Sequence, residues 1–113
     1  MPSVYKICPA ALWRAAERNG VLYGSEHDLR DGFIHFSTAA QLAETAAKHF
    51  AGQTDLLLIS VDTDRLGDAL RWEPSRGALF PHLYGSLPLN VVTNVAPLLR
   101  GADGQHAFPP SGA

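Results

Sequence analysis

The sequence predicts a single α+β domain with about six β-strands and two main helices. Its length of 113 residues is close to the commonest size of one domain. Two segments repeat apolar residues at helical spacing, and several short apolar or alternating runs between Gly, Pro and polar residues are typical of strands. The hydrophobic fraction of 46% allows one buried core without disulfides. We therefore expect one core in which helices pack on strands.

The N-terminal part of the chain predicts a strand, a helix and a second short strand. Residues 4–7 form an apolar opening strand, and the apolar spacing of residues 10–19 is that of a helix. Gly20 suits the left-handed position that follows a helix. Residues 21–23 are a short apolar run, whereas residues 25–32 are polar and are expected to form a loop.

A further strand is expected over residues 33–36, and it leads directly into the second helix. Because side chains alternate along a strand, His35 and Ser37 lie on the same face. Thr38 with a glutamine three residues later forms the pattern of a capping box. The helix that begins there is expected to continue over residues 39–50.

The second half of the chain is expected to consist of strands. They are predicted over residues 56–61, 69–73, 80–84 and 89–95. The first of them is apolar at nearly every position, which suits a central strand buried on both faces. We expect residues 1–100 to form the globular domain and residues 101–113, rich in Gly, Pro and Ala, to be a disordered tail.

The charge and apolar patterns exclude several classes of function. Nine basic and eleven acidic residues give a net charge of -2, and no basic stripe of a nucleic-acid binder is visible. No apolar run approaches about 18 residues, so no membrane span is expected. A lone Cys8 excludes an internal disulfide, and without a secretory signal we expect a cytoplasmic protein. The low charged fraction of 18% suggests that some surface lines a cleft or faces a second subunit, as in a homodimer.

The polar chemistry is concentrated in two phrases, FIHFST and FPHLYG. In the first, His35 shares a strand face with Ser37. In the second, His82 shares a face with Tyr84, and an imidazole beside a phenol can position a ligand or transfer a proton. We expect these four side chains to line one cleft. The alternative is a buried histidine before a helix cap and a buried, hydrogen-bonded His–Tyr pair.

Other residues with reactive side chains carry weaker signals. Glu73 ends a strand beside a Pro-Ser-Arg-Gly loop, where it could orient an imidazole or bind a ribose hydroxyl, or remain solvated. Cys8 precedes a helix and is expected to be a small N-terminal cap, not a nucleophile. His35, His82 and Glu73 have the types of a two-histidine, one-carboxylate iron site, but such scattered ligands predict no tightly bound metal. The three remaining histidines, His27, His49 and His106, receive no role.

From Tyr5 to about Leu98 the chain resembles a family of small bacterial and plant proteins known as domain of unknown function 952. The resemblance is carried by several phrases: YKI from Tyr5, GFIHFST from Gly32, RWEP from Arg71 and FPHLYG from Phe80. The Phe-Ile-His and Pro-His-x-Tyr-Gly phrases are specific in combination.

This family looks like a compact relative of the ADP-ribosyltransferase fold, which includes the RNA 2′-phosphotransferases. The resemblance implies a split or strongly bent sheet and an NAD cleft lined by His35, Ser37 and Thr38. It also implies that Lys6 faces the nicotinamide ribose and that Glu73 stands near the reacting ribose. NAD would then be a substrate, and no cofactor would be tightly bound.

The sequence departs from the family pattern at two positions. Lys6 stands where a histidine is usual, and Cys8 where a threonine is usual. A charged lysine donates hydrogen bonds but accepts none, which weakens the case for NAD chemistry. The leading hypothesis is a cleft for a nucleotide or ADP-ribose-like ligand, with or without ADP-ribosyl transfer. The alternatives are a non-catalytic ligand-binding or regulatory module, and a two-histidine phosphoesterase built on His35 and His82.

Overall fold

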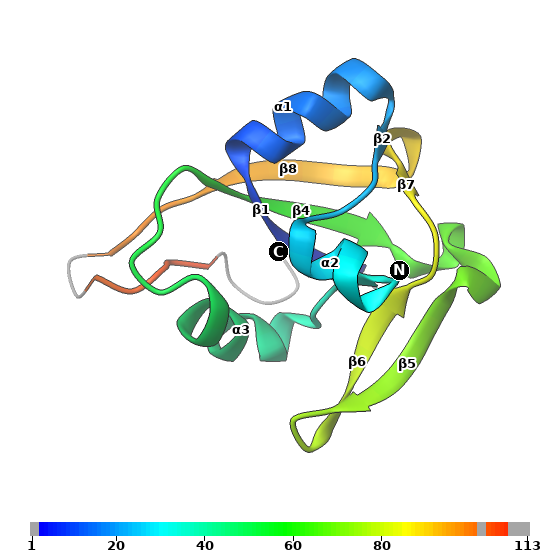
Figure 1. Ribbon diagram of the computed structural model, residues 1–113. Helices are drawn as coiled ribbons and strands as arrows, with labels where there is room; N and C mark the ends of the chain where they lie inside the picture. Colours follow the sequence, from blue (N-terminus) through cyan, green and yellow to red (C-terminus); the bar gives the residue numbers. More distant parts are fainter. Residues whose placement is uncertain (1–2, 102–103, 109–113) are drawn as a thin grey trace.

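Strands dominate the computed structural model, which describes residues 3–101 and 104–108 (Figure 1). Its strands are β1 (Ser3–Pro9), β2 (Val21–Leu22), β3 (Ile34–His35), β4 (Leu56–Asp62), β5 (Leu70–Ser75), β6 (Ala78–Leu83), β7 (Leu87–Pro88) and β8 (Val92–Leu98). Its α-helices are α1 (Ala10–Asn19), α2 (Glu26–Asp31) and α3 (Leu42–His49). All strand pairs are antiparallel, so the α+β class predicted from the sequence is confirmed.

A three-stranded sheet in the order β1-β4-β8 forms the centre of the molecule. Successive side chains of β1 and β4 point to opposite faces of this sheet and belong to two different core clusters. Ile59 is in one cluster and its neighbour Leu58 is in the other. Helix α1 covers one face with Trp13, and α3 covers the other with Leu42 (Figure 1). The predicted central strand is therefore confirmed, because β4 is buried on both faces and flanked on both edges.

A second three-stranded sheet, in the order β3-β6-β5, carries both histidine phrases. Strands β5 and β6 form a hairpin whose two-residue turn, Arg76-Gly77, has φ values of 50° and 80°. In the register of β3 and β6, His35 lies opposite His82. Reciprocal backbone hydrogen bonds of 2.8 Å between Tyr5 and Ser37 link this sheet to β1. The His-bearing strands are thus held against the central sheet.

The helix ends follow local sequence signals. Helix α1 ends at Gly20, which has a φ of 79° and donates its N–H to Ala16. The second predicted helix begins with a 3₁₀ turn, Ala39–Gln41, before α3. There the Thr38 N–H donates to Gln41 Oε1 at 3.0 Å, as expected for a capping box. Both predicted helices are therefore present.

Three expectations about the elements are wrong. Residues 26–31 form helix α2, not a loop, and the helix is too short to show an apolar period. Residues 87–88, expected in a turn, form β7 and pair with β2. The last strand lies over Val92–Leu98 after a 3₁₀ turn, and its Pro97 is compatible with the edge of the sheet.

The segment after β8 is ordered where the structure describes it. Arg100 pairs with His106, and the Ala107 N–H donates to Leu99 O at 2.7 Å. Phe108 packs against the core cluster that contains Leu42. Residues 104–108 therefore contact the domain, residues 102–103 and 109–113 lie outside the described part, and the disordered tail expected for residues 101–113 stays a prediction. No helix among the described residues is long and apolar enough to cross a membrane.

Candidate functional site

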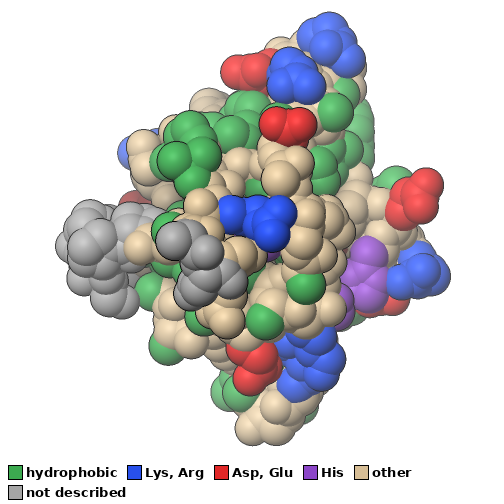
Figure 2. All heavy atoms as spheres, turned by 90° about the vertical axis from the view of Figure 1, so that its left-hand side faces the viewer, with side chains coloured by type: hydrophobic (Ala, Val, Ile, Leu, Met, Phe, Trp, Pro, Cys, Tyr) green, Lys and Arg blue, Asp and Glu red, His purple; other side chains and the backbone are tan. Residues whose placement is uncertain are grey.

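A cleft of about 870 Å³ lies between α2, β3, α3 and the β5–β6 hairpin. Four residues singled out from the sequence are in its wall: Lys6, His35, Ser37 and His82. Three others, Thr38, Glu73 and Tyr84, do not line it. The structure therefore brings the two histidine phrases to one cleft but leaves Tyr84 outside. On the face of the molecule shown in Figure 2, acidic and basic side chains are interspersed, and histidine is also visible there.

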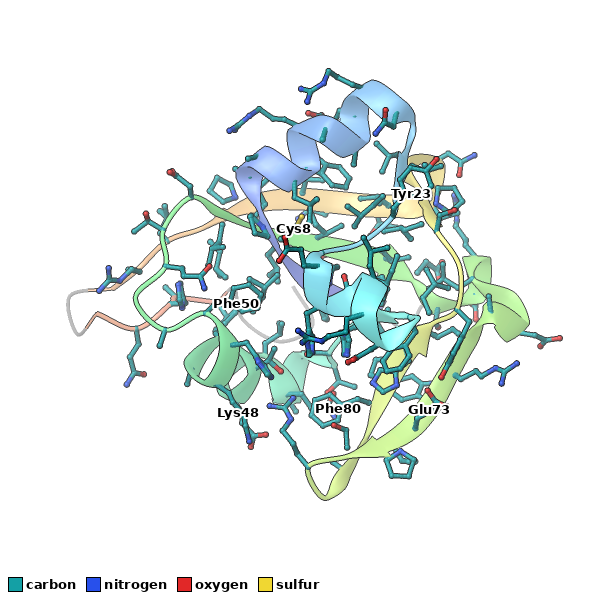
Figure 3. All side chains as sticks on the ribbon, viewed as in Figure 1. Cys8, Tyr23, Lys48, Phe50, Glu73 and Phe80 are labelled. Atoms are coloured by element: carbon teal, nitrogen blue, oxygen red, sulfur yellow. The ribbon has the colours of Figure 1, made fainter. Side chains whose placement is uncertain are left out.

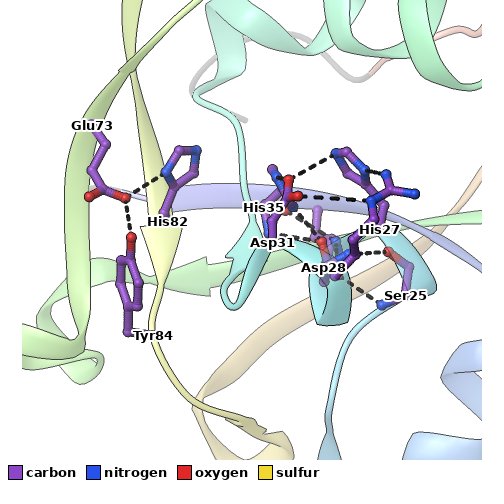
Figure 4. Close-up of polar contacts among 10 residues, drawn as sticks. Ser25, His27, Asp28, Asp31, His35, Glu73, His82 and Tyr84 are labelled. Carbon is purple, nitrogen blue, oxygen red and sulfur yellow. Dashed lines mark hydrogen bonds and ion pairs between the residues drawn. The ribbon is translucent and has the colours of Figure 1, made fainter.

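Asp28, on α2, is the central acidic residue of the site. It is 2% exposed. Its carboxylate contacts His35 Nδ1 at 2.6 Å and Lys6 Nζ at 2.9 Å, and it accepts from the backbone N–H of His35 and Ser25 at 3.1 and 2.9 Å (Figure 4). Burial opposes ionisation, but the hydrogen bond from His35 and the charge of Lys6 outweigh it, so the pKa of Asp28 lies well below its ordinary range. Asp28 is therefore ionised and fixes the orientation of the His35 ring through its Nδ1 atom.

Sequence reasoning missed Asp28 because it placed the segment in a loop. The signal was present: Ser25 and Asp28 have the spacing of a capping box, and both reciprocal hydrogen bonds form. Gly24 makes the approach of the helix possible. Its φ is 113°, and a Cβ there would lie 2.7 Å from Asp28 Cβ.

Lys6 lines the cleft but is buried, and its ammonium is bonded to protein groups. Besides the ion pair with Asp28, its ammonium donates to His35 O at 3.2 Å. The Lys6 side chain therefore stabilises the Asp28–His35 pair by binding the Asp28 carboxylate and the His35 carbonyl oxygen. The role that the family resemblance implies for Lys6, facing the nicotinamide ribose, stays a prediction.

His82 is held by Glu73 in the same way as His35 is held by Asp28. Glu73 Oε1 lies 2.9 Å from His82 Nδ1 and accepts from the Tyr84 hydroxyl at 2.7 Å (Figure 4). The hydrogen bonds from Tyr84 and His82 lower the pKa of Glu73, and the same bond to Glu73 raises the pKa of Tyr84. Because Glu73 occupies Nδ1 of His82, the other ring nitrogen, Nε2, points away from Glu73. No described residue forms a hydrogen bond with His82 Nε2.

Aromatic contacts fix both imidazoles. Phe33 stacks on His82, with ring centroids 4.0 Å apart, and the ring of His27 stacks on His35 at 4.4 Å. The His35 and His82 rings meet edge to face at 5.4 Å. The imidazoles are therefore held in place by neighbours on both sides.

The opposite wall carries hydroxyl and cationic groups. Ser37 Oγ and Thr45 Oγ1 are 3.0 Å apart, and Arg76 Nη2 donates to Thr45 Oγ1 at 3.3 Å. The guanidinium lies 4.4 Å above the Phe80 ring. Its Nη1 is buried and has no hydrogen-bond partner among the described residues, although Glu44 Oε1 is 3.5 Å away. This nitrogen therefore forms a long ion pair with Glu44 but no hydrogen bond to the described residues.

Two histidines to which the sequence assigned no role also line the cleft. His27 comes from α2 and His49 from α3, next to Lys48. Burial and then the charge of Arg76 lower the pKa of His49. Figure 3 shows Lys48 on α3 and Phe80 on β6 on the same side of the molecule, and Glu73 lies opposite Phe80 in the β5–β6 register. Cations therefore gather at the α3 end.

A possible set of metal ligands also lies in the wall, at the α2 end. His27, Asp31 and His35 each offer one ligand atom, and these atoms lie within 4.8 Å of one another. The set differs from the His35, His82 and Glu73 combination weighed from the sequence. His82 and Glu73 are instead bonded to each other.

Comparisons with known proteins identify relatives. A family model described as "Protein of unknown function (DUF952)" matches residues 7–95. The crystal structure of protein CC0527 from Caulobacter crescentus is 49% identical, covers 93% of each chain and has a TM-score of 0.89. The solution NMR structure of CC0527 gives 50% identity and a TM-score of 0.84, covering 93% of this chain and 91% of that one. No curated protein matches.

Proposed function

The chain belongs to the family of proteins of unknown function called DUF952, and from the geometry of its cleft we propose that it binds a phosphate-bearing small molecule of the nucleotide or ADP-ribose type. The cleft volume of about 870 Å³ is within the range of small-molecule sites. One end offers cationic and hydroxyl donors, and the other offers histidines. An anionic group at the cationic end would leave the rest of the ligand beside the apolar wall that contains Phe36 and Phe50.

The buried Nη1 of Arg76, which forms no hydrogen bond to the described residues and only a long ion pair with Glu44, is the observation that carries the proposal. A buried N–H without an acceptor costs about 1–3 kcal/mol, and a phosphate oxygen is a strong acceptor for a guanidinium. The left-handed backbone at Arg76, with a φ of 50°, destabilises the folded state by roughly a further 1–2 kcal/mol, since this turn position favours Asn or Gly. Stacking on Phe80 and the contacts with Thr45 and Glu44 hold the guanidinium in the cleft wall, where a bound anion would supply the missing hydrogen-bond acceptor.

The remaining polar groups suit the same ligand. Lys48 and His49 line the cleft near Arg76, whose charge contributes to the lowered pKa of His49. An anion in this position would be attracted by the charges of Lys48 and Arg76, and His49 can donate a hydrogen bond to it. The Ser37 and Thr45 hydroxyls lie between this end and the histidines, where they can bond to ribose or phosphate oxygens.

The contacts favour binding over the catalytic alternatives. Glu73 is bonded to His82 and Tyr84 and does not line the cleft, so it is poorly placed to orient a ribose for ADP-ribosyl transfer. His35 has a carboxylate at each ring nitrogen, which leaves no free nitrogen for a two-histidine phosphoesterase. The likeness to the ADP-ribosyltransferase fold stays a prediction.

Isothermal titration calorimetry with ADP-ribose, NAD, ADP and adenosine tests the proposal. We expect saturable binding of the phosphorylated probes and much weaker binding of adenosine. Arg76→Gln should weaken that binding about ten- to a hundredfold, the loss of one charge-assisted hydrogen bond. Arg65→Gln, on an exposed position outside the cleft, is the matched control. Absence of binding, or equal affinities in wild type and Arg76→Gln, would overturn it.

A further inference from the structure

We propose that His27, Asp31 and His35 form a site for one divalent transition-metal ion, with Zn²⁺ as the representative ion. The inference does not rest on the proposed nucleotide site. Two nitrogen ligands and one carboxylate are a donor set that zinc takes in open sites, where a further position remains for a water or ligand. All three residues line the cleft, so that further position would face it.

The distances between the donor atoms fit such an ion. Two ligand atoms, each bonded to a tetrahedral zinc at about 2.0–2.1 Å, are about 3.3 Å apart. Asp31 Oδ2 lies 3.0 Å from His35 Nε2 and 3.5 Å from His27 Nε2, on either side of that value. His27 and Asp31 are one turn apart on α2, so they share a helix face, and the nearby β3 supplies His35. Two of the three distances therefore match the spacing around one zinc ion, and the donor atoms of His27 and His35 lie within 4.8 Å of each other.

The position of His35 between two carboxylates is a second geometric observation. Its Nδ1 faces Asp28 at 2.6 Å and its Nε2 faces Asp31 at 3.0 Å. An imidazole nitrogen and a carboxylate oxygen are both zinc ligands, and this spacing allows one ion to bind both atoms.

Asp28 supplies the support that metal-binding histidines usually have. A ligating histidine commonly donates its other N–H to a carboxylate, which fixes the ring and its tautomer. Asp28 is buried and holds His35 Nδ1 in this way, while Lys6 neutralises its second oxygen. This arrangement leaves Nε2 of His35 directed toward Asp31 and His27.

Arg30 opposes metal binding in the present arrangement. Its Nη2 lies 2.5 Å from His27 Nδ1, where it donates, so a neutral His27 carries its proton on Nε2, the atom the metal needs. The Arg30 side chain is 71% exposed and can turn away into water. Removing it should therefore tighten metal binding, because it frees the His27 ring and removes a positive charge beside the site.

Zinc titration calorimetry on the full chain, without an affinity tag and after treatment with a chelator, tests the proposal. We expect one Zn²⁺ per chain. His27→Gln and Asp31→Asn should each weaken binding at least tenfold, and Arg30→Ala should strengthen it several-fold. His106→Gln, which lies outside the donor set and outside the cleft, is the matched control and should leave the affinity unchanged.

Thermal melts in chelator establish that each variant is folded, which is expected because His27 and Asp31 are exposed. The proposal is wrong if no saturable Zn²⁺ binding occurs, or if binding persists unchanged in both His27→Gln and Asp31→Asn. Since no nucleotide is added, either result is separate from the fate of the proposed nucleotide site.

Discussion

His35 and His82 lie directly opposite each other in the antiparallel register of β3 and β6, and their rings meet edge to face at 5.4 Å. Opposite residues project from the same face of a sheet. A different carboxylate holds each ring: Asp28 from α2 and Glu73 from β5. The site therefore consists of two oriented imidazoles with unequal surroundings, one between two acids and one with a free nitrogen.

Asp28→Asn should destabilise the protein by about 3–5 kcal/mol, because it leaves the buried Lys6 without its counter-charge. Urea unfolding measures the effect. Asp31→Asn is the control, since Asp31 is exposed and its loss should cost under about 1 kcal/mol. Similar small losses in both variants would contradict the role assigned to the Asp28–Lys6 pair.

The same carboxylate should make stability depend on pH. Its pKa is lowered on folding, so its contribution is present above the unfolded value of about 3.9 and is lost as the pH falls toward the folded value. The free-energy gap between wild type and Asp28→Asn should therefore narrow between about pH 5 and pH 2. Urea melts across this range test it, and a constant gap would refute it.

Glu73→Gln should bring the pKa of Tyr84 down toward its ordinary value. The hydrogen bond to the Glu73 carboxylate is the main cause of the raised pKa of Tyr84. A glutamine in place of Glu73 carries no negative charge, so it removes the main reason for the Tyr84 hydroxyl to keep its proton. Ultraviolet titration of the tyrosines measures the change, and Tyr84→Phe identifies which phenol moves. An unchanged titration curve would show that the Tyr84–Glu73 bond does not form in solution.

Arg76→Asn should be more stable than Arg76→Ala by about 1 kcal/mol. Both variants lose the guanidinium, but asparagine tolerates the left-handed backbone with a φ of 50° far better than alanine. Thermal or urea unfolding of the pair isolates the backbone contribution. Equal stabilities would mean that the turn relaxes and that Arg76 is not held against a backbone cost.

Cys8 should be unreactive in the folded protein. Burial raises the pKa of its thiol to about 11, and the nearby charge of Lys6 opposes this only in part. A disulfide reagent at about pH 8 should react slowly with native protein and rapidly in urea. Rapid labelling of the native protein would indicate that β1 opens or that the thiol is accessible. The sequence-based expectation of a non-nucleophilic role would then need revision.

Phe108→Ala should destabilise the protein by about 1–2 kcal/mol, because its half-buried ring packs on the core cluster beside Phe50. A chain ending at Arg100 should lose at least as much. Leu99→Ala, at a side chain that is 68% exposed, is the control and should change stability by less than about 0.5 kcal/mol. A truncated chain as stable as the full one would support the expectation of a dispensable tail.

Several features were predictable because they depend on short stretches of chain. The apolar run of β4, the glycine at the end of α1 and the capping box at Thr38 all appear as expected. Helix α2 was not found because six residues are too few for a periodic pattern, although its Ser25 cap was a usable signal. The last strand, expected over residues 89–95, lies at Val92–Leu98 because pairing with β4, and not the local apolar pattern, sets its position.

The sequence by itself determined the α+β class and the strand faces that place His35 with Ser37 and both histidines beside a cleft. These properties follow from alternation and capping within a few residues. Only the tertiary structure decided which acid holds which imidazole, and that Arg76 and His27 face the same cleft. Those contacts depend on the docking of α2 and on the register of the β5–β6 hairpin, and both are fixed by packing between segments distant in the chain.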